Sequence, residues 1–252
     1  GCLLRCNTQV FGQILDTNSK WLSERLMLAG VETIEHVTIG DSRAGTADAL
    51  RRLALLSPLV IVTGGLGPTD DDLTREGLAD ALGEPLVEDV DALRSLTAIF
   101  AQRGREITPM QARQALRPRS ARCLVNPHGT APGLYAVLPT NSPHQASDVF
   151  CLPGPPKELG PMFDRLVLPA LRLPPGVAVL ARQMTVIGIG EGDAAKRVGE
   201  LMARDRNPLV GITASNAVLT WRVLYRGRGS SVEAVAAVDA TFASIRSAMG
   251  DH

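Results

Sequence analysis

Leu59-Val-Ile-Val-Thr-Gly-Gly-Leu-Gly-Pro-Thr-Asp-Asp-Asp-Leu-Thr-Arg-Glu-Gly-Leu-Ala-Asp-Ala-Leu82 is the stretch that decides the fold of this chain. Its apolar start, residues 59–62, is too short to cross a membrane and too apolar for an edge strand, so it predicts a central parallel strand covered on both faces. A glycine turn follows. Gly64, Gly65 and Gly67 let the backbone turn sharply and leave its amides approachable, as anion-binding loops require.

The residues after the glycine turn predict a helix N-terminus. Thr69 and Asp72 have the spacing of a capping box, and the apolar residues that follow recur with helical periodicity. Free amides and the helix dipole favour a phosphate there, but the carboxylates of Asp70, Asp71 and Asp72 would repel it. Either a divalent cation lies between carboxylates and phosphate, or the acidic residues only complement the helix dipole.

Strands and helices alternate through the first part of the chain. Strands are expected at residues 2–6 and 31–39, with helices beginning near Asp16 and Asp41. This alternation predicts an α/β fold with a mostly parallel sheet, which binds ligands outside the carboxyl ends of its strands. The loop at residues 7–18 is then expected to lie at the same edge as the glycine turn.

The middle of the chain offers further candidate binding segments. Residues 88–117 are predicted to be helical, and their arginines either reach toward phosphate or form a solvated helix face. The loop at residues 126–133 lies between two short strands. There Gly129 and Thr130 offer amides and a hydroxyl to a ligand, or the loop is a tight connector. Near residue 157, Lys157 or Glu158 is expected to face the strand ends.

A domain boundary is predicted near residue 174. The segment at 173–176 has the composition of a linker, which divides the chain into residues 1–174 and 175–252. Beyond it, the patterns predict strand, helix, two strands and helix, a small α+β unit.

Composition excludes several classes of protein. Lys plus Arg and Asp plus Glu are equal at 26 each, so no large field draws the chain to nucleic acid or to an anionic membrane. No apolar run approaches the roughly 20 residues that span a bilayer. The four cysteines show no zinc-like spacing. A cytoplasmic protein with reduced thiols is expected.

Three motifs, in order, resemble the CinA (competence/damage-inducible) family and its molybdopterin-binding-like domain. They are Thr63–Glu76, Asn126-Pro-His-Gly-Thr-Ala-Pro-Gly133 and Leu152-Pro-Gly-Pro-Pro156. The first motif is more distantly similar to molybdopterin adenylyltransferases. The resemblance implies a three-layer sandwich followed by a KH-like α+β domain. That second domain has no Gly-x-x-Gly loop and a balanced charge, so dimerisation or lid packing is expected rather than RNA binding.

The resemblance also implies a function, a metal-dependent hydrolysis of ADP-ribose to AMP and ribose 5-phosphate. Many family members carry a further deamidase domain, which is not expected within these 252 residues. Magnesium, cobalt or manganese is the implied cofactor, with Asp70, Asp71 and Asp72 as metal ligands. Asp71 and Asp72 are the expected catalytic residues, and Asp72 aligns with the aspartate shared with the adenylyltransferases. The expected substrate-binding residues are Gly64, Gly65, Gly67, Thr69, Asp16, Asn18, Gly129, Thr130, Gly154 and Lys157. No nucleic acid or membrane partner is expected. The chain is expected to form a homo-oligomer, either a dimer or a trimer.

Two residues depart from the family pattern. Asn7 stands where a glycine is expected and Gln9 where a glutamate is expected. A glutamine can hydrogen-bond a ribose hydroxyl but cannot accept a proton at neutral pH. Two alternatives therefore stay open: a molybdopterin-binding nucleotidyltransferase, and a nucleotide-binding or scaffold protein without catalysis, in which Gln9→Glu would create activity.

Overall fold

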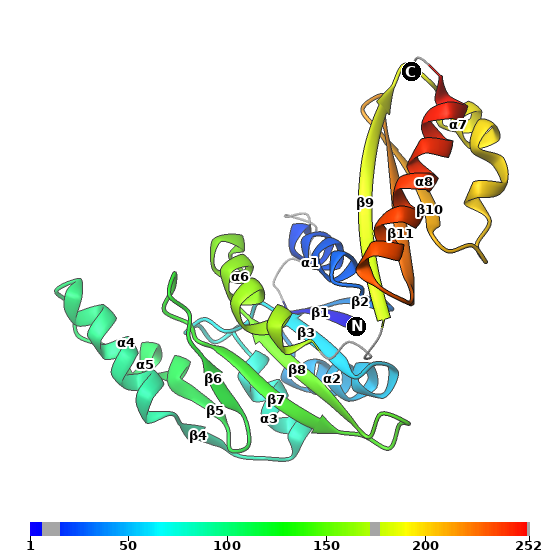
Figure 1. Cartoon of the computed structure of the whole chain (residues 1–252). Helices are drawn as coiled ribbons and strands as arrows, with labels where there is room; N and C mark the ends of the chain where they lie inside the picture. Colours follow the sequence, from blue (N-terminus) through cyan, green and yellow to red (C-terminus); the bar gives the residue numbers. More distant parts are fainter. Residues whose placement is uncertain (7–15, 172–176, 251–252) are drawn as a thin grey trace. The chain divides into compact units, whose positions relative to one another are not determined.

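The chain folds into two compact units. The computed structural model describes residues 1–6, 16–171 and 177–250. The first unit comprises Gly1–Ser23 and Glu32–Leu171, and the second comprises Glu24–Val31 and Arg172–His252 (Figure 1). The predicted linker at residues 173–176, like Asn7 and Gln9, lies outside the described residues.

The first unit is built on a six-stranded sheet in the order β2-β1-β3-β8-β7-β6. The first four of these strands run parallel, and β7 and β6 are antiparallel to their neighbours. The sheet is therefore mostly parallel, as predicted. Its strands are β1 (Cys2–Cys6), β2 (Glu35–Ile39), β3 (Leu59–Thr63), β6 (Arg122–Leu124), β7 (Gly133–Pro139) and β8 (Ala146–Leu152).

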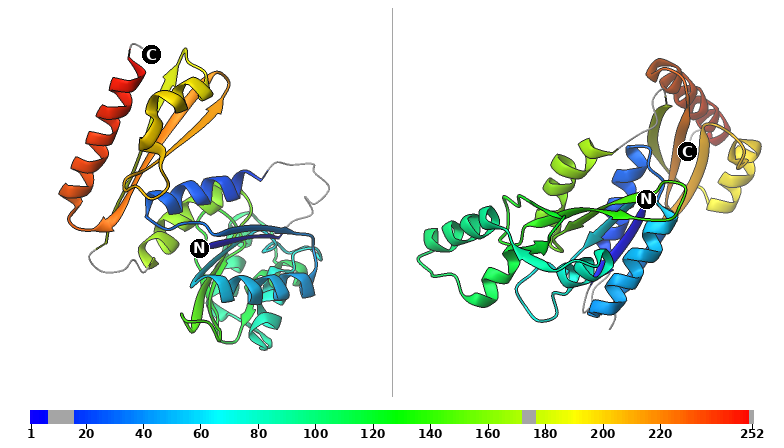
Figure 2. Two further views of the ribbon diagram at one scale, coloured as in Figure 1. Left: turned by 90° about the vertical axis from the view of Figure 1, so that its right-hand side faces the viewer. Right: turned by 90° about the horizontal axis from the view of Figure 1, so that it is seen from below.

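Helices cover both faces of this sheet, which gives three layers (Figure 2). All five residues of β3 are buried, as expected for a central strand, because its alternate side chains enter two different cores. Val60 and Val62 join the core under α2 (Arg43–Leu56) and α3 (Thr74–Leu82). On the other face, α1 (Thr17–Leu28) packs Trp21 edge-on against Phe163, with 5.5 Å between ring centroids. Phe163 follows α6 (Pro156–Met162).

The segment predicted as one helical stretch, residues 88–117, is only partly helical. Thr108 caps α5 (Pro109–Ala112) in a capping box with Gln111. A two-stranded antiparallel ribbon, β4 (Leu86–Glu88) with β5 (Leu116–Pro118), closes the segment and was not predicted. Its pairing joins residues far apart in the chain, which local periodicity does not show. The helical pieces are α4 (Val90–Gln102), α5 (Pro109–Ala112) and η2 (Arg113–Ala115), and after α6 come η3 (Phe163–Val167) and η4 (Leu168–Ala170).

The second unit is a small α+β fold, as predicted. Three antiparallel strands in the order β10-β11-β9 carry a core that includes Trp221 and Val223, and α8 packs Val238 and Phe242 into the same core. The strand, helix, strand, strand, helix order matches the sequence patterns. The elements are β9 (Val177–Ile187), α7 (Glu191–Val198), η5 (Gly199–Met202), β10 (Leu209–Ser215), β11 (Val218–Arg228) and α8 (Ser231–Met249). Among the described residues of both units, no helix combines the length and apolar character needed to cross a membrane.

Candidate functional site

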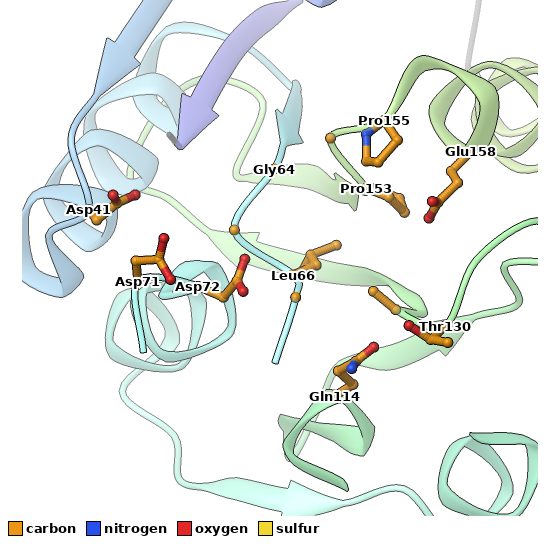
Figure 3. A pocket seen from close by; sticks show the side chains of 14 residues that line it. Asp41, Gly64, Leu66, Asp71, Asp72, Gln114, Thr130, Pro153, Pro155 and Glu158 are labelled. Atoms are coloured by element: carbon orange, nitrogen blue, oxygen red, sulfur yellow. The ribbon is translucent and has the colours of Figure 1, made fainter. Parts of the chain in front are cut away.

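Loops from distant parts of the chain meet at the carboxyl edge of the parallel strands. The glycine turn follows β3, and Pro153-Gly154 follows the neighbouring β8. Leu134 at the start of β7 pairs with Cys151 near the end of β8, which brings the loop at residues 126–132 to the same edge. These loops surround an open pocket of about 340 Å³ (Figure 3). It is lined by Asp41, Gly64, Gly65, Leu66, Gly67, Asp71, Asp72, Gln114, Thr130, Ala131, Pro153, Gly154, Pro155 and Glu158.

The glycine turn forms one side of the pocket. Gly64 and Gly65 have φ angles of 90° and 66°, a backbone conformation that favours glycine. The Gly64 amide donates to the Leu152 carbonyl at 3.0 Å, which ties the turn to β8. The amides of Gly65, Leu66 and Gly67 have no acceptor within residues 1–6, 16–171 and 177–250. Three donors therefore stand at the pocket without a described partner.

Arg75 supports the turn from the protein interior, a role that the sequence patterns did not reveal. Its side chain is only 1% exposed, and it donates to the carbonyls of Leu66 at 2.7 Å and Gly67 at 2.6 Å. Burial lowers the pKa of Arg75, because a buried guanidinium loses its hydration. Thr74 adds a bond from its hydroxyl to the Gly64 carbonyl at 2.8 Å. The carbonyls of Gly64, Leu66 and Gly67 thus accept hydrogen bonds from the side chains of Thr74 and Arg75.

The Thr69 and Asp72 pair does not form the predicted helix cap. The α3 helix begins at Thr74, and its N-cap residue, Leu73, makes no side-chain bond to the helix. Instead, the Asp72 amide donates to the Thr69 carbonyl at 3.1 Å, which completes a separate turn before the helix. In that turn the Asp72 carboxylate accepts the Thr69 amide at 3.0 Å and the Thr69 hydroxyl at 2.5 Å. Asp72 is therefore held at the pocket by Thr69.

Carboxylates gather on one side of the pocket. Asp41, which follows β2 and was expected only to begin a helix, lies with Asp71 and Asp72 beside the glycine turn (Figure 3). Burial and then the charges of Asp71 and Asp72 raise the pKa of Asp41. Asp70 does not share this position. Its exposed carboxylate accepts a hydrogen bond from Arg113 at 2.8 Å, and Asp70 does not line the pocket. The metal site expected at Asp70, Asp71 and Asp72 stays a prediction.

The opposite side of the pocket is polar. Glu158 and Thr130 line it, and the Glu158 carboxylate accepts a hydrogen bond from the Asn126 amide at 2.8 Å. A side chain at Gly129 would displace the Glu158 carboxylate and the Asn126 amide from their present positions. Of the two residues predicted near 157, Glu158 reaches the pocket, whereas Lys157 is exposed and does not line it. The reason is helical geometry, since adjacent residues of α6 point about 100° apart.

Asp16 and Asn18 hold the loops rather than line the pocket. Asp16 accepts hydrogen bonds from the Ser19 amide at 3.0 Å and hydroxyl at 2.6 Å. The buried Asn18 amide donates to the Thr63 hydroxyl at 3.1 Å and the Gly154 carbonyl at 2.7 Å. Asn18 therefore joins the ends of β3 and β8.

Each of the two units matches a known family model. Residues 5–173 match the family model described as probable molybdopterin binding domain, and residues 181–252 match the model described as damage-inducible protein CinA KH domain. The chain belongs to the CinA family. Relatives named competence-damage inducible protein from Moorella thermoacetica and Symbiobacterium thermophilum are each 38% identical, over 96% of this chain. The chain spans 57% and 56% of those two relatives.

A solved CinA structure supports the same fold for the first unit. The CinA protein from Thermoplasma acidophilum, described as of unknown function, is 30% identical with a TM-score of 0.58. The match covers 66% of this chain and 95% of that one. The CinA family assignment thus rests on both sequence and structure.

The carboxylates of this pocket could fill only part of the coordination shell of a divalent cation. Within the described part of the chain, no group of three or more His, Cys, Asp or Glu residues is placed to hold a metal ion. Asp41, Asp71 and Asp72 place three carboxylates along one side of the pocket; burial, and then the charges of Asp71 and Asp72, raise the pKa of Asp41. Magnesium-like ions are usually held by one or two carboxylates, with the remaining ligands from water and substrate phosphate. Asp71 and Asp72 would be those two carboxylates.

Proposed function

We propose that this pocket binds ADP-ribose and hydrolyses it to AMP and ribose 5-phosphate with magnesium, cobalt or manganese. One observation carries the proposal. Gly65, Leu66 and Gly67, whose backbone amides have no acceptor among the described residues, line the same pocket as Asp71 and Asp72. Amides bind phosphate oxygens, whereas carboxylates repel them unless a cation lies between. A diphosphate with a divalent cation satisfies both groups.

The roles of the residues follow from their contacts. The turn amides donate to the diphosphate, and Arg75 keeps the turn in its binding conformation by holding the opposite carbonyls. Thr69 holds the Asp72 carboxylate in place to receive the cation. In this proposal Thr69 is a positioning residue, and its role as a direct ligand for the substrate is dropped.

The reaction consumes one water. An oxygen–phosphorus bond forms from the water, and the bond from that phosphorus to the bridging oxygen breaks. The two protons of the water end on the products and the solvent. A bound divalent cation would offset the charge of the diphosphate and polarise its phosphoryl oxygens. The protein positions the diphosphate so that its bridging bond is aligned for attack.

A turnover assay tests the proposal. Purified protein is mixed with ADP-ribose and magnesium, cobalt or manganese, and AMP and ribose 5-phosphate are measured by chromatography. We expect both products in equal amounts, and none with EDTA. Binding without turnover would contradict hydrolysis and support a nucleotide-binding or scaffold protein.

A second candidate is binding of molybdopterin for nucleotidyl transfer. It is favoured by the match of residues 5–173 to the model described as probable molybdopterin binding domain. Calorimetric titration with molybdopterin and with ADP-ribose separates the two candidates. Tighter binding of molybdopterin would favour the second.

We also propose that the chain forms a homo-oligomer and does not bind RNA through its second unit. Its sequence has no Gly-x-x-Gly pair between residues 178 and 250, the loop with which KH domains clamp an RNA backbone. Light scattering after size exclusion would give the mass of the assembly. A monomer would contradict the proposal.

A further inference from the structure

Gln114 presents a buried amide to the pocket. Its side chain is 1% exposed, yet its Oε1 has no hydrogen-bond partner among the described residues. Gln114 nevertheless lines the pocket, and Figure 3 shows its amide end directed into it, on the same side as Thr130. A buried, unpaired carbonyl oxygen is rare in folded proteins, and it destabilises the fold unless a ligand completes it.

The backbone around Gln114 is fixed from both ends. The preceding helix is capped by Thr108 and Gln111, and the Ala115 carbonyl accepts the Asp89 amide at 2.9 Å. Ala115 itself is fully buried in a core with Leu96. The backbone of Gln114 is therefore held in place, and the 1% exposure of the residue leaves its side chain little room to turn. The unpaired oxygen is held where it stands.

The chemistry of the amide limits what can pair with it. A carbonyl oxygen accepts hydrogen bonds, so an ionised phosphate, which also only accepts, does not satisfy it. The amino group of adenine and the hydroxyls of ribose are donors. Gln side chains bind adenine by a paired donor and acceptor contact in other complexes. The nucleoside half of the substrate is the part that carries matching donors.

We propose that Gln114 determines specificity for the nucleoside half of the substrate by accepting a hydrogen bond from its adenine amino group or a ribose hydroxyl. This inference rests on the proposed function for the class of ligand, but not on hydrolysis. A site built to receive a hydrogen bond rejects an analogue that lacks the donor, because its polar atom is then left unpaired.

Binding of nucleoside monophosphates tests this without turnover. AMP, IMP, 2′-deoxy-AMP and 3′-deoxy-AMP are titrated calorimetrically into the full chain and into Gln114→Met. IMP lacks the amino group, and each deoxy compound lacks one hydroxyl. For the native chain we expect one of the three analogues to bind at least roughly tenfold more weakly than AMP. In Gln114→Met, AMP should weaken to the level of that analogue, so that the discrimination disappears.

Two further variants separate recognition from a structural role. Gln114→Glu keeps an acceptor, so it should keep the preference for AMP while its added charge weakens all four ligands. Gln102→Met, at an exposed position, should change nothing. The melting temperature of Gln114→Met should not fall, because methionine removes the unpaired amide.

Three results would overturn the inference: equal affinities of the native chain for all four ligands, no AMP binding, or unchanged discrimination in Gln114→Met. A clear fall in melting temperature with all four ligands weakened equally would also overturn it, in favour of a structural role. If discrimination is seen but ADP-ribose is not hydrolysed, the proposed function fails and the inference stands.

Discussion

Replacing Arg75 with methionine should loosen the glycine turn without unfolding the rest of the chain. Arg75 makes two hydrogen bonds, to the carbonyls of Leu66 and Gly67, at 2.7 and 2.6 Å. A hydrogen bond to a charged group contributes about 1.5–3 kcal/mol. Methionine fills the space but donates to neither carbonyl, and it also removes the cost of burying a charge. We therefore expect a net loss of about 2–4 kcal/mol in the free energy of opening the turn.

Hydrogen exchange read by mass spectrometry measures that free energy locally. Since about 1.4 kcal/mol corresponds to a factor of ten, amides in residues 59–82 should exchange roughly 30- to 1000-fold faster in Arg75→Met. Amides of α8, which belongs to the second unit, provide an internal control that should not change. Arg94→Met is the matched control variant, and it should leave the exchange of residues 59–82 unchanged. Arg94 is 74% exposed, so its ion pair with Asp91 contributes little to stability.

The same variant should weaken binding of the proposed ligand. A turn that opens more often presents its amides in the binding conformation less of the time, so the affinity for ADP-ribose should fall together with the protection of residues 59–82. Unchanged exchange and unchanged affinity in Arg75→Met would refute the role given to Arg75. Equal changes in α8 would show a global loss of stability instead.

Four other predictions concern the acidic side of the pocket and one thiol. Gly67→Ala places a methyl group against the Asp72 carboxylate, so the manganese affinity, measured by paramagnetic resonance, should fall. Gly160→Ala is the control, because a methyl group there meets only ordinary van der Waals contacts and should leave the affinity unchanged. Equal affinities in the two variants would contradict a role for the contact between position 67 and Asp72. Asp41→Asn should weaken manganese binding by roughly threefold to tenfold through loss of one negative charge, and an unchanged affinity would remove Asp41 from the site. Because the pKa of Asp41 is raised above its ordinary 3.8, the folded chain binds the extra proton, so the contribution of Asp41 to stability rises as pH falls from its folded to its unfolded pKa. Urea titrations across that window should show the stability of the native chain rising relative to that of Asp41→Asn as pH falls, because the difference isolates Asp41 from the other carboxyl groups. Burial raises the pKa of Cys123 to about 12, so iodoacetamide at pH 8 should alkylate it roughly a thousandfold more slowly in the folded chain than in urea; comparable rates would contradict this.

The sequence predicted the parts of the site that depend on short-range patterns. The apolar run at residues 59–62 and the glycines after it were sufficient to place a buried strand and a turn at the carboxyl edge of the sheet. Thr130 and Gly154, which the resemblance implied as substrate-binding residues, line the pocket at the same edge. Alternation of strands and helices sufficed because parallel strands end at one edge.

The details that the sequence could not predict depend on side-chain direction and distant partners. Asp70, Asp71 and Asp72 are equivalent in the sequence, and only the position of Arg113 separates Asp70 from the other two. Lys157 and Glu158 differ by one step of a helix, which decides which of them reaches the pocket. A buried arginine could not be inferred at position 75, because its partners are backbone carbonyls, which leave no pattern of residue types.

The rate of ADP-ribose hydrolysis with manganese, compared between the native chain and Asp72→Asn, tests the central claim most directly. Asparagine can still accept a hydrogen bond from Thr69 through its amide oxygen, so the turn is kept while the charge is removed. We expect AMP and ribose 5-phosphate from the native chain, and a fall in kcat/KM of at least roughly a hundredfold in Asp72→Asn. No AMP from the native chain, or the same kcat/KM in both proteins, would contradict a cation-assisted diphosphate hydrolysis in this pocket.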